Sequence, residues 1–381
     1  MEGTKNITKL TEKNLSPIKL AWLKLLQNKI AVIGLVVILT FLFIAVLGPI
    51  IRPDSSPKAN QQHLELARKP PGFTVKFLRL PASTFQANGV LYSFVFGFEP
   101  AYKEIPIDSF TLKADGVEII KYTGDEVSEG EVLLYPKTLF DEFEEDEVIY
   151  EKTFILGTDR YGRDLLSRLM AGTWISFTVG FISILISLLI GISLGAIAAY
   201  FGGKTDDLIM WFINVIWSIP TLLLVIAMTL ALGKGFWQVF VAVGLTMWVE
   251  VARVVRGQVL STKQMEFVEA GKSFGFSTFR IISKHILPNV TGPIIVISAS
   301  NFAAAILIEA GLSFLGLGAQ PPQATWGKMI AEHKGYIITG DAYLAIFPGI
   351  AICLLVLSFV LLGNGLRDAF DTKNTKQQTG I

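Results

Sequence analysis

Long apolar runs are the feature of this sequence that most restricts its fold. A run of about 20 apolar residues is long enough to cross the hydrocarbon core of a bilayer as a helix. Runs of about this length lie at 30–51, 174–200, 208–232, 236–252, 291–316 and 344–366. The fourth run is short and has polar edges. We therefore predict an all-α polytopic membrane protein with about six transmembrane helices, and five is the alternative.

The composition agrees with a membrane protein and argues against several kinds of site. Of the 381 residues, 51% are hydrophobic and 17% are charged, whereas about a quarter of the residues in a soluble domain are charged. The net charge of +1 gives no indication of a nucleic-acid partner. His63, His285 and His333 lie far apart, and Cys353 is the only cysteine. We expect no disulfide framework, no metal site and no catalytic residues in this chain.

The positions of the basic residues predict the orientation of the chain. Lys and Arg accumulate on the cytoplasmic side of membrane proteins. Six lysines precede the first apolar run, and this run is longer than the apolar part of a signal peptide. Loop 253–290 and the C-terminal end also carry an excess of basic residues. We predict an uncleaved first span at 30–51, a cytoplasmic N-terminal tail at 1–29 and a cytoplasmic C-terminal tail at 372–381.

Residues 15–29, at the end of the N-terminal tail, have the pattern of a short helix. Ser16 can cap this helix, and Pro17 suits the first helical position. Apolar residues and lysines mix at helical spacing, which is typical of a helix that lies in the membrane interface in contact with lipid. A plain extension of the first span is the alternative.

The sequence pattern changes completely between residues 52 and 155. The segments FTVKFLRL, GVLYSFVFGF, SFTLKADGVEIIKY and EVLLYP are rich in β-branched and aromatic residues, which predicts strands. The pair Asp115–Gly116 is a hairpin signal. Because the first span is predicted to exit outward, 52–155 is expected to form a small β-rich extracytoplasmic domain. The acidic stretch 141–152 is predicted to be a solvated loop or edge.

A polar segment lies at 266–289, within the predicted cytoplasmic loop. Its first part consists of good helix formers, and Gly275 can end this helix in a left-handed turn. Ser277 can cap a second helix, FRIISKHIL, which Leu287–Pro288 is predicted to end.

The first of these helices carries an apolar stripe. Phe267, Ala270 and Phe274 recur at i, i+3 and i+7 and are flanked by charged residues. Such a stripe can dock into the groove of a partner protein. Alternatively, the helix lies on the headgroups of its own lipid.

Four segments resemble one protein family. Glu269–Ala270–Gly271, Gly275 and Leu287–Pro288 together resemble the EAA loop of permease subunits of ABC importers that use binding proteins. The other three resemble segments of the dipeptide and oligopeptide branch: LGTDRYGRDLLSRLMAG at 156–172, GLSFLGLGAQPPQATWG at 311–327 and LLGNGLRDAFD at 361–371. The resemblance covers about 156–371 and, more weakly, the first span. Departures from the family pattern are Gly271, His285, Trp174 and Asn364.

The resemblance implies the fold of a type I ABC importer permease, with a core at 156–371 that contains five transmembrane helices. In that family the first helix of the EAA loop is the coupling helix, which inserts into a cleft of the ATP-hydrolysing subunit. The residues that the resemblance assigns to this role are Glu266, Phe267, Glu269, Ala270, Gly271, Phe274 and Gly275.

The resemblance also implies partners and a location. The partners are a second, similar permease subunit, two ATP-binding subunits and an extracytoplasmic substrate-binding protein. The location is the inner (plasma) membrane, and the implied substrates are peptides.

A translocation path needs helices that can part and polar side chains that face a cavity. Prolines can kink the predicted spans, and polar side chains within a span are expected to face protein or water. The candidates for the path or a gate are Ser218, Pro220, Asn289, Pro293, Asn301 and Glu309. Ordinary packing kinks and interhelical hydrogen bonds are the alternatives.

Glu309 is the acid that lies deepest in an apolar run. A buried carboxylate is costly unless it is paired or hydrated. We expect it near the outer face, where it lines the outer mouth, pairs with a basic group such as Arg163 or Arg168, or contacts a partner subunit. Our hypothesis is that Glu309 stabilises a closed outer gate.

The sequence contains no phosphate-binding loop of the form GxxxxGK[ST]. We therefore expect that this chain binds no cofactor and that partner subunits use ATP and Mg²⁺. The alternatives are an ABC importer for a non-peptide substrate such as a nickel chelate, a secondary transporter driven by an ion gradient, and a membrane enzyme. A secondary transporter tends to place charges near the bilayer midplane, and we predict none there.

Overall fold

A computed structural model describes residues 17–370, except 82–88, 90–91, 94–96, 125–129, 141–147 and 234. The predicted Ser16 cap, much of the predicted strand 89–98, most of the acidic stretch 141–152 and the tail 372–381 lie outside these residues. The chain divides into two compact units. Unit 1 comprises Met1–Phe41, Phe177–Leu312 and Ile352–Ile381, and unit 2 comprises Leu42–Ser176 and Ser313–Ala351.

Five helices in the described part of the chain are long and apolar enough to cross a membrane. They are α3 (Lys29–Ile51), α6 (Leu165–Phe201), α9 (Phe236–Thr262), the helical run Thr278–Phe314, which ends with α12 (Thr291–Phe314), and α15 (Tyr343–Phe370). A bent pair, α7 (Gly203–Trp217) and α8 (Thr221–Leu232), is a sixth span if the pair counts as one. The choice between five and six spans therefore depends on this pair.

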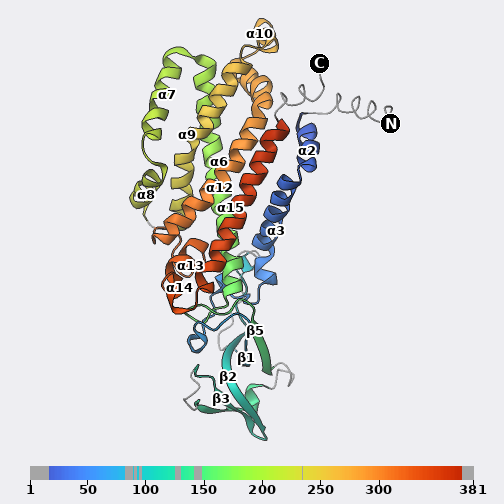
Figure 1. Ribbon diagram of the computed structural model, residues 1–381, viewed down its shortest axis with the longest axis vertical. Helices are drawn as coiled ribbons and strands as arrows, with labels where there is room; N and C mark the ends of the chain where they lie inside the picture. The colour runs from blue at the N-terminus through green and yellow to red at the C-terminus, as the bar shows by residue number, and fades with distance from the viewer. Residues whose placement is uncertain are drawn as a thin grey trace, which may run out of the picture. The chain divides into compact units, whose positions relative to one another are not determined.

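The predicted span at 208–232 is sharply bent, as a proline kink allows, because α7 and α8 meet at an angle of 89°. The break lies at Ser218, Ile219 and Pro220. Pro220 has no N–H to donate and disfavours helical geometry at the residue before it, which explains why α7 ends here. Pro220 then becomes the N-cap of α8. Figure 1 shows the change of direction between the two helices.

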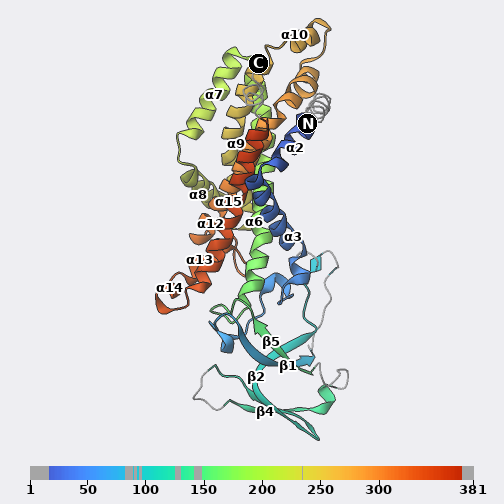
Figure 2. The ribbon, with the colours of Figure 1, turned by 45° about the vertical axis from the view of Figure 1, so that its right-hand side comes forward.

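The fourth span was predicted to end at 252, but α9 continues to Thr262. Arg253 and Arg256 lie within this helix and have partners on α7. Arg256 forms a bidentate pair with Asp206, in which its Nε and Nη2 each donate a hydrogen bond of 2.6 Å to the carboxylate. The Arg253 guanidinium lies 3.6 Å from the centroid of the Trp217 ring. Because α7 lies beside α9 (Figures 1 and 2), these charges do not end the helix.

The second helix of the polar loop does not end at Leu287–Pro288 as predicted. After α10 (Glu266–Ser273), the side chain of Ser277 caps α11 (Thr278–Arg280), as predicted. A π-helical turn (Ile281–Ile286) and a 3₁₀ turn (Leu287–Val290) then lead into α12. Pro288 cannot donate a helical hydrogen bond, and the irregular turns let the chain pass it without a break.

A separate short helix, α2 (Pro17–Gln27), precedes α3, as predicted. Asn28 separates the two helices, and its Oδ1 accepts hydrogen bonds from the N–H groups of Ile30 and Ala31, both at 3.2 Å. Buried residues of α2 pack in one cluster with Ala31 and with the C-terminal end of α15. The position of α2 in a membrane interface stays a prediction.

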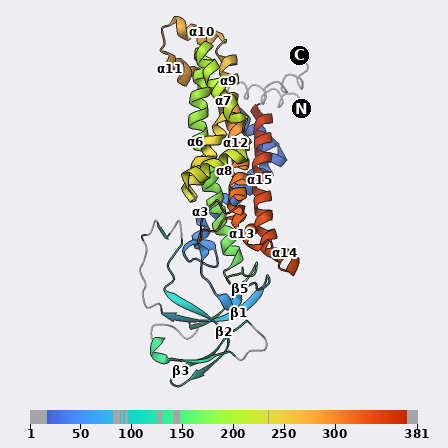
Figure 3. The same ribbon diagram turned by 90° about the vertical axis from the view of Figure 1, so that its left-hand side faces the viewer.

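Unit 2 contains a five-stranded antiparallel sheet in the order β4-β3-β2-β1-β5 (Figures 2 and 3). The strands are β1 (Phe73–Pro81), β2 (Tyr102–Lys113), β3 (Gly116–Lys121), β4 (Val132–Pro136) and β5 (Ile149–Phe154). Phe77 and Leu78 belong to different buried clusters because successive side chains point to opposite faces of a sheet. The small β-rich domain exists, and its extracytoplasmic placement stays a prediction.

Most of the predicted strands match the sheet. FTVKFLRL forms β1, EVLLYP forms β4, and SFTLKADGVEIIKY contributes to β2 and β3. The hairpin turn lies at Ala114 and Asp115, because Lys113 pairs with Gly116. The predicted strand 89–98 is wrong where it is described, since Tyr92 and Ser93 are helical. The acidic stretch 141–152 was predicted to be a solvated loop or an edge. β5 begins within this stretch and forms an edge of the sheet.

Two of the family-like motifs, 156–172 and 311–327, meet within unit 2. Trp326 begins α13 (Trp326–His333), which α14 (Tyr336–Thr339) follows. The buried Trp326 ring donates a hydrogen bond from Nε1 to the Leu169 carbonyl at 2.9 Å. Arg168 Nη1 donates to the Pro322 carbonyl at 3.0 Å. A Cβ atom on Gly172 would lie 2.6 Å from Trp326 Cδ1, so glycine permits this close packing.

Candidate functional site

Helix α10 is short, and the geometry of its C-terminal end explains why. Gly275 has a φ of 73°, a left-handed conformation that glycine adopts at little cost. Its N–H donates to the Lys272 carbonyl at 2.9 Å, and the Phe276 N–H donates to the Gly271 carbonyl at 3.1 Å. These two bonds form a Schellman motif. The predicted left-handed stop at Gly275 is confirmed.

One side of α10 packs against unit 1. Val268 and Gly271 are buried. Val268 is fully buried and belongs to a cluster with residues of α6, residues of α9, and Ile281 and Ile286 of the π-helical turn. Burial of a valine side chain of this kind stabilises the packed state by about 1.5–3 kcal/mol. The helix is therefore held by its inner face.

The opposite side of α10 is exposed. It carries the predicted stripe of Phe267, Ala270 and Phe274, and the Phe274 side chain is 77% exposed. Glu266 and Glu269 are also exposed and add negative charge. We call these five residues the α10 surface. Figure 3 shows α10 at one end of the helices of unit 1, beside the C-terminal end of α9.

A lysine connects the base of α10 to α6. Lys263 follows α9, and its Nζ donates to the carbonyls of Tyr200 at 2.5 Å and Ala199 at 3.4 Å. These carbonyls lie in the last turn of α6, where carbonyl groups have no partner within the helix. A cation is favourable at this end of the helix dipole. The end of α9, which precedes α10, is thereby fixed to the end of α6.

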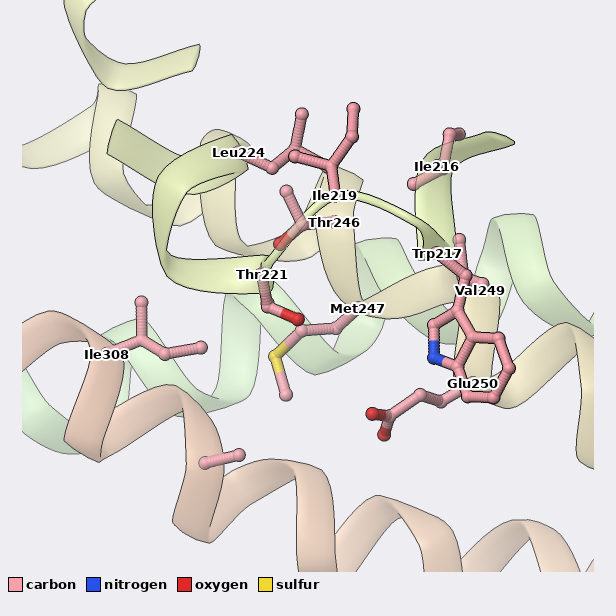
Figure 4. Close-up of a pocket in the computed structure, with 11 residues that line it drawn as sticks. Ile216, Trp217, Ile219, Thr221, Leu224, Thr246, Met247, Val249, Glu250 and Ile308 are labelled. Atoms are coloured by element: carbon pink, nitrogen blue, oxygen red, sulfur yellow. The ribbon is translucent and has the colours of Figure 1, made fainter. Parts of the chain in front are cut away.

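A cavity of about 200 Å³ lies in unit 1 where α7 breaks from α8 (Figure 4). Its walls come from α7, α8, α9 and α12, and they are mostly apolar. The polar side chains on its walls are Thr221, Thr246 and Glu250, and the Trp217 indole lies near the Glu250 carboxylate. The break places these groups together, because a straight helix over 208–232 would have no such junction.

The structure does not bring the six predicted path residues into one site. Ser218 and Pro220 lie at the break, next to residues that line the cavity. Asn289 is exposed on the 3₁₀ turn and donates to the His285 carbonyl at 2.6 Å. Pro293 lies in the first turn of α12, directly after the 3₁₀ turn.

The other two path candidates, Asn301 and Glu309, are buried on α12. Among the described residues, the Asn301 side-chain nitrogen has no hydrogen-bond partner. Glu309 is 2% exposed, so its carboxylate does not face the outside of the chain. Arg163, one of its predicted partners, forms its ion pairs with Asp159 at 2.6 Å and Glu332 at 3.8 Å. The roles of Asn301 and Glu309 stay predictions.

Glu250 lines the cavity but was not among the predicted path residues, because the fourth span was predicted to end at 252, next to the cytoplasmic loop. In the longer α9 it lies near the midpoint of the helix. The signal available in the sequence was an acid between the apolar residues Trp248, Val249 and Val251.

Comparison with known proteins identifies the family. A model described as "Binding-protein-dependent transport system inner membrane component" matches residues 191–376, and one described as "N-terminal TM domain of oligopeptide transport permease C" matches residues 16–71. The dipeptide transport system permease protein DppC of Bacillus subtilis is 45% identical over 217 residues, which are 57% of this chain and 68% of the relative. The chain belongs to the binding-protein-dependent transport permease family.

Other relatives of this permease carry different names. The glutathione transport system permease protein GsiD of Pectobacterium atrosepticum is 42% identical and covers 57% of this chain and 72% of its own length. The oligopeptide transport system permease protein OppC of Haemophilus influenzae is 43% identical, with coverages of 57% and 70%. Among solved structures, the MetNI methionine ABC transporter covers 54% of this chain and 97% of its own, with 18% identity and a TM-score of 0.44.

Family membership confirms the main resemblance drawn from the four motifs. The permease is a multi-pass inner-membrane transport subunit with several apolar helices, and the family is that of the type I ABC importer permease fold. The match at 191–376 includes both the α10 surface and the cavity.

Proposed function

We propose that this permease imports peptides in an ATP-driven ABC importer and that the α10 surface binds the ATP-hydrolysing partner. The observation that carries the proposal is an exposed apolar stripe, flanked by two acids, on a short helix whose opposite side is buried. The named relatives transport dipeptides, oligopeptides or glutathione, which supports a peptide substrate.

The packing of α10 supports a role in transmitting motion. Val268 joins the helix to a cluster that contains residues of α6 and α9, and Lys263 joins the end of α9 to the end of α6. A displacement of α10 by a partner therefore acts directly on two long helices. ATP and Mg²⁺ are used by two partner subunits in this proposal, and this chain binds neither.

A second permease subunit completes the proposed pathway. α7 and α8 expose many large apolar side chains, including Leu208, Trp211, Leu223 and Leu230. An exposed apolar face of this kind is typical of contact with lipid or with another membrane subunit. The break between α7 and α8 places the cavity at this face, which suits a path shared by two subunits.

In the proposed orientation both termini are cytoplasmic, the α10 surface faces the cytoplasm and the sheet of unit 2 is extracytoplasmic. A binding protein delivers the substrate at the outer side. The sheet either seats this protein or the sister permease, or it serves as a spacer. Exposed apolar residues at Leu112, Val132 and Leu134 favour the seating role.

The first experiment is co-purification of the permease with the ATPases encoded beside it. The variants are Glu269→Lys and Phe274→Ala on the α10 surface, with Lys284→Glu as a control that reverses an exposed charge in the same loop. We expect wild type and Lys284→Glu to retain the ATPases and both α10 variants to lose them. Retention by both α10 variants contradicts the docking role.

A transport measurement tests the rest of the proposal. The complex is reconstituted in vesicles with the binding protein, and uptake of labelled dipeptides and of a nickel chelate is compared with and without ATP. We expect ATP-dependent uptake of dipeptides. Uptake driven by an ion gradient in the absence of the ATPases indicates a secondary transporter, and ATP-dependent uptake of the nickel chelate alone indicates a non-peptide importer.

A further inference from the structure

Glu250 occupies an unusual position in an apolar helix. It lies near the midpoint of α9, and its side chain is exposed whereas its neighbours Val249 and Val251 are buried. An ionisable side chain within a membrane-spanning helix is costly, and such residues commonly face a cavity where they bind a substrate or an ion. The Glu250 side chain meets this description because it lines the cavity at the α7–α8 break (Figure 4).

The nearby basic residue does not neutralise Glu250. Arg253 lies one helical turn further along α9, but its guanidinium stacks on the Trp217 ring at 3.6 Å and its Nη2 donates to Asn214 Oδ1 at 2.9 Å. Across the described parts of the two units, the Glu250 carboxylate forms no ion pair or hydrogen bond. Its negative charge therefore faces the cavity without compensation.

The other walls of the cavity define which ligand fits. Thr221 and Thr246 offer hydroxyl groups, and Ile219, Met247 and Ile308 offer apolar surface. The volume of about 200 Å³ is below the 300–1,000 Å³ that is usual for a whole drug-sized ligand. The cavity therefore suits one end of a substrate that combines a positive charge with an apolar body.

We propose that Glu250 binds the ammonium group of a peptide substrate in this cavity. The inference rests on the proposed peptide-import function and adds the chemistry by which the permease itself recognises its substrate. An ammonium group supplies three donors to the carboxylate and the threonine hydroxyls, and charge-assisted hydrogen bonds of this kind are the strong ones. The ammonium belongs either to the peptide N-terminus or to a lysine side chain.

The test measures binding to the purified complex of both permeases and the ATPases, without the binding protein, by equilibrium dialysis. The probes are alanyl-phenylalanine, its N-acetyl derivative and N-acetyl-alanyl-lysine. The variants are Glu250→Gln and Glu250→Asp, and the matched control is Asp207→Asn, which removes an exposed carboxylate of α7 outside the cavity.

We expect the wild-type complex to bind alanyl-phenylalanine about 10- to 100-fold more tightly than its N-acetyl derivative, the range of a hydrogen bond to a charged group. Glu250→Gln abolishes this preference, whereas Glu250→Asp and Asp207→Asn retain it. Tight binding of N-acetyl-alanyl-lysine shows that the cavity binds a lysine ammonium as well. Weak binding of this probe shows that the cavity is specific for the N-terminal ammonium.

Three results overturn the inference: no preference in wild type, a preference that survives in Glu250→Gln, or loss of the second permease from the Glu250→Gln complex. The last result makes Glu250 an assembly contact. ATP-driven peptide uptake without an ammonium preference rejects only this inference. Absence of ATP-driven uptake for every peptide rejects the proposed function.

Discussion

Two glycines of the polar loop show how different the requirements at neighbouring residues are. Gly275 adopts a left-handed φ and ends α10, whereas Gly271 has helical geometry inside it. The family motif that this loop resembles has alanine at the position of Gly271. A Cβ atom there would lie 3.5 Å from Phe276 Cδ2 and 3.9 Å from Ile281 Cγ1, which are ordinary contacts. Alanine therefore fits at position 271, whereas the left-handed backbone disfavours it at position 275.

Gly271→Ala is expected to stabilise α10 by about 1 kcal/mol, because alanine has the higher helix propensity. Amide hydrogen exchange in residues 266–274 should slow by about fivefold, measured in the purified complex. Gly275→Ala is the matched comparison and should cost about 1–2 kcal/mol, since an L-residue is strained at this φ. Equal exchange rates in the two variants contradict the prediction.

Glu309→Gln tests the gate hypothesis at a single buried carboxylate. The substitution keeps the shape of the side chain and removes its charge. If the charge stabilises a closed outer gate, basal ATP turnover without binding protein should rise and uptake should fall, both by severalfold. Unchanged turnover together with unchanged uptake refutes the hypothesis.

At the scale of helices and strands, apolar run length predicted where spans lie but not where they end or bend. The fourth span was predicted to end at 252, and Arg253 and Arg256 were assigned to the basic loop that follows. The partners that accommodate them, Trp217 and Asp206, come from α7 and lie far away in the sequence. Helix ends that depend on such tertiary pairs cannot be read from local pattern.

The two prolines at predicted boundaries behave differently for a related reason. Pro220 breaks its span by 89°, whereas Pro288 lies in a helical run that continues through π and 3₁₀ turns. At either proline, the sequence shows only that one backbone hydrogen bond of the helix is missing. Packing decides the outcome, because Ile281 and Ile286 are buried in the cluster around Val268 and hold the run in place.

Gly172→Ala is expected to destabilise the contact between α6 and α13. The added Cβ would lie 2.6 Å from the ring of Trp326, a buried and hydrogen-bonded side chain that cannot easily move. Overpacking of this kind typically costs about 1–3 kcal/mol. A lower unfolding temperature and faster proteolysis within unit 2 are the readouts.

Gly257→Ala on α9 is the control for that experiment. No atom lies within 4 Å of the position of its Cβ, so alanine should be neutral or slightly stabilising. Equal losses of stability in the two variants would show that the α6–α13 contact is not the cause.

The sheet of unit 2 should lose stability as the pH falls. Burial lowers the pKa of His63 below its ordinary value of 6.5, against the opposing effect of Glu104, whose carboxylate lies 4.0 Å away. The unfolded chain therefore takes up a proton before the folded chain does. This contribution to stability is present above pH 6.5 and is lost as the pH falls from 6.5 toward the lower pKa of the folded state.

Hydrogen exchange of the β1 amides at pH 7.5 and 5.5, corrected for the intrinsic rate, measures this effect in the purified complex. We expect the free energy of opening to be smaller at pH 5.5. His63→Gln removes the titrating group and should reduce the difference between the two pH values. A difference of the same size in the variant assigns the effect to another group.

On the scale of the whole molecule, the α10 surface was predicted from sequence and the cavity was not. The α10 surface depends on residues three, four or seven positions apart in one helix, and helical periodicity reveals such a pattern. The cavity depends on the break between α7 and α8 and on side chains from two other helices, α9 and α12, including Met247 and Ile308. Assembly of distant segments of this kind requires the tertiary structure.

Removal of most of the sheet tests the role of the insert. Val75 of β1 faces Lys152 of β5, so a two-residue Asn-Gly turn can join them directly in place of residues 76–151. If the sheet seats the binding protein, this deletion should weaken its binding at least tenfold while the ATPases still co-purify. Full affinity for the binding protein excludes the seating role and leaves the spacer.

The pairing of β1 with β5 also bears on how such a chain changes over evolutionary time. Phe73 and Phe154 face each other, so the polypeptide leaves and returns at nearly one place. Facing residues of an antiparallel pair are about 5 Å apart at their Cα atoms. Insertions and losses between them leave the distance between the flanking segments unchanged. Lineages can therefore gain, shorten or replace this segment without redesigning the helices that carry transport.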